Sequence, residues 1–287
     1  MLCECVPSLG QVAFVLVSFF AGKFAIGKLL ERYNARTETD VHKKDWKKDV
    51  VYLYQFPRAP VTPNLSPFCL KLETWLRANK ITYEVVPTYT LRSTKGLLPF
   101  VEINGKEIAD SQHIIFELEK QFEVKSELNA EQAGISRTVD RLIDGNTFYA
   151  LIYSKVYENA PKFLSKESSG MPIPSFLIPV IGYLFSQKIF GRLKSHGMGK
   201  FPPSVVYDQL RRDLRAVDGI LGDKDFICGD KPSLADFTFF GHIGSCYFLP
   251  YNQPVTDMLN HEFPRLLALL KRIRTEFWSD WDNLCSS

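Results

Sequence analysis

Two hydrophobic patterns follow one another along this chain of 287 residues. Residues 50–56 and 81–88 have the length and the β-branched and aromatic content of strands. Between them, Ser66 followed by Pro67 is a strong helix start, and Asn79 is a helix stop. A strand, a helix of about a dozen residues and a second strand form a crossover, which predicts that the two strands are parallel.

The following segment predicts a hairpin and another helix. Residues 98–103 read as a strand that Pro99 interrupts, and Asn104-Gly105 strongly favours a two-residue turn, so that residues 106–109 return antiparallel. A helix with one apolar face then begins at Ser111. Residues 50–124 are therefore predicted to form an α/β domain with the element order βαβ-ββα.

Beyond residue 125, helical spacing replaces strand signals. A clean apolar stripe runs along one segment through Val206, Leu210, Leu214, Val217 and Leu221. Ser233 and Asp236 have the spacing of a capping box, which we assign to folding alone, and residues 264–278 predict a further amphipathic helix. Residues 125–287 are expected to form an all-helical domain.

A proline-punctuated insert between Pro161 and Pro203 is apolar in its first part and basic afterwards. It is too interrupted to span a membrane, and we expect it to pack against the helical domain. The alternative is that it lies on a membrane surface through four apolar side chains: Phe176, Leu177, Leu184 and Phe185.

The N-terminus has the pattern of a membrane anchor. Residues 6–22 carry no charge, and many Lys and Arg residues follow them. By the positive-inside rule, residues 1–30 are predicted to hold one spanning helix that leaves the rest of the chain in the cytosol. A buried or interfacial helix is the alternative reading. Residues 31–49 mix both charge signs and are expected to be a linker.

Composition narrows the remaining classes of function. The chain has 35 basic and 32 acidic residues, and a formal charge of +3 is too small to indicate a nucleic-acid partner. Six cysteines in a chain of this length do not form a secreted disulfide scaffold and favour a reducing compartment. Cys3 and Cys5 would make an incomplete soft-metal site, and the five histidines lack metal-ligand spacing, so no metal site is expected.

The element order and three short motifs resemble the glutathione transferases. Ser66-Pro67-Phe68-Cys69 stands where thioredoxin-like domains carry Cys-x-x-Cys, Leu98-Pro99-Phe100 looks like the strand start with its cis-proline, and Asp110-Ser111 is similar to the pair that holds the γ-glutamyl end of glutathione. The strings SPFCLKLETWLR and LLPFVEINGKEIADSQ are similar to the failed axon connections and metaxin branch, and most to the nematode cadmium-inducible lysosomal proteins. The resemblance implies a thioredoxin-like N-terminal domain and a helical C-terminal domain.

The same resemblance assigns roles in a glutathione site. Ser66 would donate a hydrogen bond to the glutathione thiolate, with simple helix capping as the structural alternative. Pro99 would be cis and would leave the N–H and C=O of Phe100 for the peptide of glutathione. Ser111 and the helix N-terminus would receive the γ-glutamyl carboxylate, while Asp110 would face its ammonium group. Cys69, one turn further along, is expected to be a buried core residue.

Two functions are consistent with these features. One is a membrane-anchored, cytosol-facing enzyme that uses glutathione on toxic electrophiles during cadmium or xenobiotic stress. The other is an inactive transferase fold that binds protein partners, or forms a homodimer, at an organelle membrane. The resemblance favours a lysosomal membrane, with the mitochondrial outer membrane as the alternative.

Overall fold

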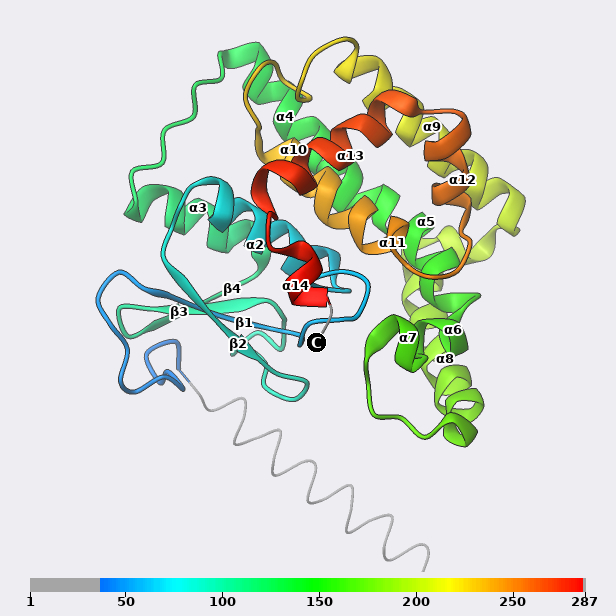
Figure 1. Cartoon of the computed structure of the whole chain (residues 1–287), viewed down its shortest axis with the longest axis horizontal. Helices are drawn as coiled ribbons and strands as arrows, with labels where there is room; N and C mark the ends of the chain where they lie inside the picture. Colours follow the sequence, from blue (N-terminus) through cyan, green and yellow to red (C-terminus); the bar gives the residue numbers. More distant parts are fainter. Residues whose placement is uncertain (1–36, 286–287) are drawn as a thin grey trace, which may run out of the picture.

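A four-stranded mixed sheet forms the centre of the N-terminal domain in the computed structural model, which describes residues 37–285 (Figure 1). The strand order is β2-β1-β3-β4. The strands are β1 (Val51–Gln55), β2 (Tyr83–Pro87), β3 (Phe100–Ile103) and β4 (Lys106–Ala109). The predicted anchor in residues 1–30 lies outside the described residues.

The strand directions confirm the crossover and the hairpin that the sequence predicts. Strand β1 pairs parallel with β2, to which helix α2 (Pro67–Ala78) connects it along the chain. On its other side, β1 pairs antiparallel with β3. Strands β3 and β4 are joined by Asn104 and Gly105, which both have positive φ angles, of 50° and 76°. Two successive residues at positive φ are what a type I′ hairpin turn requires.

The two faces of the sheet are covered by different parts of the chain. Strand residues alternate between the faces, so Val51 and Leu53 pack under α2 and helix α3 (Ser111–Gln121). Tyr52 and Tyr54 point to the opposite face, where they form a separate small core with Phe100. We call this second side of the sheet the outer face.

Residues 37–49 cover part of the outer face, although their mixed charge predicts a linker. Val41 is buried, and the Glu107 N–H donates a hydrogen bond of 2.7 Å to the carbonyl of Glu38. The ring of His42 lies 5.4 Å from that of Tyr54, between ring centroids. The charged side chains of this segment are mostly exposed while Val41 and His42 face the sheet, so this segment belongs to the folded domain.

Helices form the regular structure of the C-terminal domain in the described residues, apart from one isolated antiparallel bridge between Phe226 and Gly229. Its core includes the predicted stripe on α9, whose five members are all buried. The helices with five or more residues, π-helical turns included, are α4 (Ala130–Leu142), η1 (Ile143–Thr147), α5 (Phe148–Ile152), η2 (Tyr153–Tyr157), α6 (Ala160–Leu164), α8 (Ile178–His196), α9 (Pro203–Leu221), α10 (Leu234–Phe239), η5 (Phe240–Gly244), α12 (Pro254–His261), α13 (Pro264–Phe277) and α14 (Trp281–Cys285). Shorter ones are α7 (Lys166–Ser169), η3 (Ser175–Leu177), η4 (Met198–Lys200) and α11 (Ser245–Tyr247).

Helix α2 is held between the sheet and the helical domain. Eight consecutive residues of α2, from Cys69 to Leu76, are buried, so the helix has no solvent-facing stripe over this stretch. Its partner in the helical domain is η5, where glycine permits a very close approach. A Cβ atom on Gly241 would lie 2.6 Å from the Pro67 carbonyl oxygen and 2.7 Å from the backbone nitrogen of Lys71.

The insert between Pro161 and Pro203 packs on one side only. Gly182, Ile189 and Leu193 of α8 are buried, in agreement with the expected packing against the helical domain. The opposite side of α8 and the preceding loop expose large apolar side chains to solvent. Within residues 37–285, no helix combines the length and the hydropathy that a membrane span needs.

Candidate functional site

The sheet register places the predicted glutathione-site residues at one end of the strands. Tyr54, Phe100 and Ala109 form one row across β1, β3 and β4. This row lies where β1 and β4 end and where β3 begins. Ser66 at the start of α2, Pro99 before β3 and Asp110 after β4 therefore belong to the same end of the sheet.

Ser66 precedes the first helical residue, but its side chain makes no capping hydrogen bond. The structural alternative for Ser66, simple helix capping, is therefore wrong. The backbone N–H of Ser66 donates to the Asn64 side-chain oxygen at 2.9 Å, and the Asn64 amide donates in turn to the Phe56 carbonyl at 2.9 Å. Buried Asn64 thus ties the loop before α2 to the end of β1.

The Ser66 hydroxyl has the thiol of Cys69 as its neighbour. Cys69 is fully buried, and burial raises its pKa to about 12 even though hydrogen bonds from the Ser66 side chain and the Phe56 backbone favour the thiolate. Cys69 is therefore a neutral thiol at physiological pH, and its predicted place in the core is confirmed. It offers no nucleophile to a substrate.

The peptide bond between Leu98 and Pro99 is cis, as the sequence motif predicts. The predicted role of Phe100 fits the structure less well. Phe100 is completely buried, and it pairs in register with Tyr54 on one side and Ala109 on the other. Because both neighbouring strands are in place, the backbone groups of Phe100 belong to the sheet ladder and are not free for a peptide ligand.

Asp110 and Ser111 begin helix α3. Asp110 has φ 76° and ψ 120°, a conformation that non-glycine residues rarely adopt. Its carboxylate accepts the backbone N–H groups of Gln112 and His113 at 3.0 Å and 3.1 Å. Asp110 therefore caps α3, and Ser111 is buried beside it. Unusual backbone geometry is concentrated at binding sites, which is compatible with the predicted role in holding a γ-glutamyl group.

Several charged residues around α2 escaped the sequence reasoning. Arg58 forms a two-bond ion pair with buried Glu73, with both N–O distances at 2.6 Å. Lys71 is fully buried and donates to Asp140 of α4 at 2.8 Å. Arg92 lies over the Phe56 ring and donates to backbone carbonyls of its own loop. Of these three cations, Arg58 and Lys71 are thus neutralised by carboxylates.

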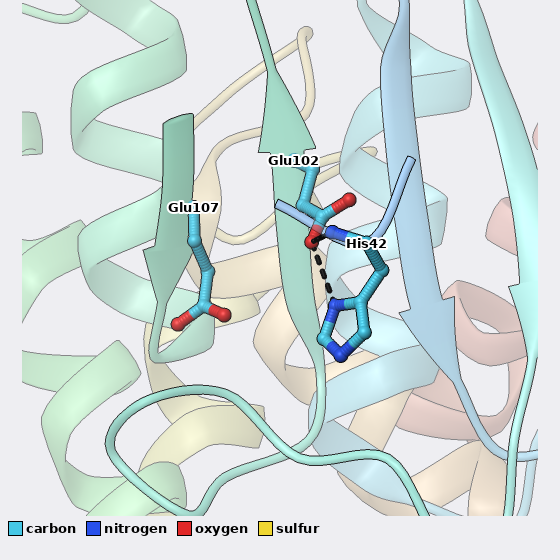
Figure 2. A group of neighbouring side chains, drawn as sticks. All are labelled: His42, Glu102 and Glu107. Carbon is cyan, nitrogen blue, oxygen red and sulfur yellow. Dashed lines mark hydrogen bonds and ion pairs between the residues drawn. The ribbon is translucent and has the colours of Figure 1, made fainter. Parts of the chain in front are cut away.

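A cluster on the outer face joins residues that are far apart in sequence (Figure 2). His42 Nδ1 lies 2.8 Å from Glu102, and Glu107 stands beside Glu102 on the neighbouring strand. One ligand atom from each of the three side chains falls within 4.8 Å of the others, which is a spacing that a metal ion could use.

Hydrogen bonds already occupy much of this cluster. Glu102 accepts the N–H groups of His42 and Lys43 at 2.7 Å and 2.9 Å, and the Tyr54 hydroxyl at 2.8 Å. Burial opposes ionisation of Glu102, but these hydrogen bonds outweigh it and lower its pKa to about 2. We interpret the cluster as the clasp that fixes residues 37–49 to the sheet. The histidine spacing gave no sign of it because the contact spans 60 residues.

Comparison with known families agrees with this architecture. The glutathione S-transferase N-terminal domain family matches residues 67–162, and the glutathione S-transferase C-terminal domain family matches residues 210–273. A solved glutathione S-transferase of Ceriporiopsis subvermispora in complex with glutathione has a TM-score of 0.53 at 19% identity, covering 78% of this chain and 97% of that chain. This likeness concerns the fold.

Curated relatives include both enzymes and proteins named otherwise. Failed axon connections of Drosophila melanogaster is 33% identical over 86% of this chain, which spans 62% of that protein's length. An isoprene-epoxide glutathione S-transferase of Rhodococcus is 24% identical over 79% of this chain and 99% of its own. A metaxin-2 homolog of Caenorhabditis elegans is 25% identical over 61% of this chain and 78% of its own. The chain belongs to the glutathione S-transferase superfamily, in the branch of failed axon connections and the metaxins.

Proposed function

We propose that this protein is a glutathione transferase-fold module that acts by binding a protein partner and does not catalyse transfer. One observation carries the proposal: the groups predicted to hold glutathione are already engaged inside the chain. The Phe100 backbone lies in the sheet and the Asp110 carboxylate caps α3, while the Ser66 hydroxyl lies beside the buried thiol of Cys69. An incoming glutathione would therefore have to displace internal hydrogen bonds before it gained its own.

The charge balance near Ser66 supports the same conclusion. Lowering the pKa of a free thiol from about 8.5 by two units takes about 2.7 kcal/mol of stabilisation of the thiolate. Arg58 and Lys71 are paired with carboxylates, so within residues 37–285 the Ser66 hydroxyl, the N-terminus of α2 and Arg92 are left to supply it. Lys155 also lies nearby, where it donates to the Leu65 carbonyl at 2.7 Å, but burial lowers its pKa and so disfavours its charged form. A helix terminus contributes roughly 0.3–1 kcal/mol at a partly exposed site.

Glutathione binding is the second candidate, and the preserved backbone of the site favours it. The Leu98–Pro99 bond is cis, the Ser66 side chain is not used for capping, and Asp110 keeps an unusual conformation at the start of α3. In this alternative, the Ser66 hydroxyl donates a hydrogen bond to the thiolate of glutathione, and Asp110 and Ser111 bind its γ-glutamyl end. The lysosomal or mitochondrial membrane location and the cadmium-stress role remain predictions from the sequence resemblance.

Calorimetric titration of the full chain with glutathione tests both candidates. The binding-module proposal predicts either no heat up to about 10 mM glutathione or millimolar binding without turnover of an electrophile such as chlorodinitrobenzene. In the second case Ser66→Ala should leave the affinity nearly unchanged, and Ser233→Ala, remote from the site, is the matched control. Turnover that Ser66→Ala abolishes, with a bound thiol that ionises below neutral pH, would overturn the proposal and establish the enzyme.

A further inference from the structure

The insert carries an exposed apolar surface in a part of the molecule away from the sheet. Helices α6 and α7 and the start of α8 project from the helical domain at the lower right of Figure 1, and the loop before α8 forms the tip. Phe176 on this loop is 77% exposed, and Tyr183 and Leu184 on α8 are 64% and 62% exposed. Val180 and Ile181 are also exposed. Large apolar side chains that gather on an exposed surface mark an interaction site.

Helical periodicity places this patch on one continuous stripe. Tyr183 and Leu184 follow Val180 by three and four residues, and Lys188 and Arg192 follow Leu184 in steps of four, so these residues share one side of α8. The stripe is apolar over the first two turns and basic over the last two. The buried residues of α8 lie on the other side of the helix. The exposed side of α8 therefore changes from apolar to basic along the length of the helix.

The basic half of the stripe lines a cleft. The cleft has a volume of about 520 Å³, and its lining includes Lys188, Arg192 and His196. The His196 ring is stacked on Tyr149, with ring centroids 3.7 Å apart. Within residues 37–285, no carboxylate lies within ion-pair distance of Lys188 or Arg192. The cleft therefore presents two cations without a protein counter-ion from the described part of the chain.

The sequence on both sides of α8 lacks acidic residues. Residues 168–207 contain no Asp or Glu, whereas about four would be expected in forty residues at the chain's overall content of 32 in 287. The same stretch holds three Lys and one Arg. A partner of negative charge is therefore favoured over a second copy of this chain, because a two-fold dimer would set these cations against themselves.

We propose that this α8 surface, formed by residues 176–196, binds the interface of an anionic lipid bilayer. Phe176, Val180 and Leu184 enter the boundary between headgroups and acyl chains, and Tyr183 lies at the headgroup level, where aromatic side chains are favoured. Lys188 and Arg192 bind the phosphate of a lipid headgroup in the cleft. The inference concerns a surface remote from Ser66 and goes beyond the proposed function.

Hydrogen exchange of the full chain, measured with and without vesicles, tests the proposal locally. Vesicles that contain phosphatidylserine should slow exchange of amides in residues 172–187 by about tenfold, and pure phosphatidylcholine vesicles should do so much less. Insertion of the predicted N-terminal anchor would hold the protein on both kinds of vesicle, so it cannot produce this difference. Exchange in the sheet should not change.

Two pairs of variants separate the apolar and the basic contributions. Phe176→Asp with Leu184→Asp should abolish the protection, whereas Tyr89→Asp, at an exposed position after β2, should keep it. Lys188→Gln with Arg192→Gln should remove the preference for phosphatidylserine, whereas Lys125→Gln with Lys271→Gln, which removes the same charge elsewhere, should retain it. These surface positions leave the fold intact, which circular dichroism checks.

Three results would overturn the inference. The first is unchanged exchange in residues 172–187 with either vesicle. The second is protection that is already present without vesicles and is lost when residues 1–36 are removed, because the patch would then be covered by the chain itself. The third is equal protection by inorganic phosphate alone, which would make the cleft a site for free anions. None of these outcomes depends on whether glutathione binds.

Discussion

Lys71 links the two domains through a buried ion pair, and replacing it by methionine should strongly destabilise the protein. Its Nζ atom lies 2.8 Å from Asp140 Oδ1 and 3.1 Å from Gln112 Oε1, and both Lys71 and Asp140 are fully buried. At an effective dielectric constant of about 20, the attraction across 2.8 Å is about 6 kcal/mol. Part of this is offset because the variant no longer desolvates the ammonium group.

The variant leaves the Asp140 carboxylate buried with weaker partners. Thr238 still donates to it at 2.7 Å and Arg137 at 3.1 Å, but Arg137 is half exposed. Removing one member of a buried pair costs about 3–5 kcal/mol, and we expect Lys71→Met to lower the free energy of unfolding by that amount. Lys120→Met, which breaks an exposed pair on α3, should change it by less than about 0.5 kcal/mol.

Urea unfolding followed by circular dichroism measures these free energies. The double variant Lys71→Met, Asp140→Asn should recover a large part of the loss, because the unpaired charge is then absent. A loss below about 1 kcal/mol in Lys71→Met, or a double variant less stable than the single one, would refute the reasoning. Either result would mean that Arg137 and Thr238 are sufficient to stabilise the buried carboxylate of Asp140 without Lys71.

Three further predictions concern the residues around α2 and the helical core. Burial lowers the pKa of His242 to about 4, so on acidification the unfolded chain binds this proton before the folded protein does, and the free energy of unfolding should fall below pH 6.5. At pH 5 the expected loss is about 2 kcal/mol, measured as the difference from the His242→Gln variant. This difference removes the opposite effect of Asp236, whose pKa burial raises to about 6, because Asp236 is present in both proteins. Cys69 should resist iodoacetamide at pH 8 in the native protein and react in urea, as peptide mass spectrometry would show; rapid native labelling would contradict its burial. Gly241→Ala should lower stability by about 1–3 kcal/mol in thermal unfolding, while Gly219→Ala, with open space around its Cβ, should not.

The local elements of this fold follow from the sequence because their signals are local. The α2 helix starts at Pro67, as Ser66-Pro67 predicts, and the Asn104-Gly105 turn sets the hairpin. The stripe on α9 identifies its buried face. Even the cis bond before Pro99 follows from a short motif. In each case the deciding residues lie within a few positions of the feature.

The features that the sequence did not reveal depend on distant contacts. Lys71 looks like a solvent-facing residue until α4 supplies Asp140, 69 residues later. His42 finds its carboxylate partner 60 residues away, so residues 37–49 looked like a linker. Phe100 loses its free backbone groups because both neighbouring strands pair with it, and only the full strand order shows this. The spacing of residues along the chain does not predict contacts between segments that are this far apart in sequence.

The attachment of residues 37–49 to the outer face has a mechanical consequence. A pull applied to the chain ahead of Thr37 reaches the sheet through residues 37–49. It loads first the hydrogen bond that the Glu38 carbonyl accepts from Glu107, and then those that Glu102 accepts from His42 and Lys43. They lie beside the central strand β3, so the force is spread into the sheet and does not act on α2 or the helical domain directly. If residues 1–30 are held in a membrane, as the sequence predicts, the attachment of residues 37–49 to the sheet shortens the part of the chain that separates the domain from the bilayer.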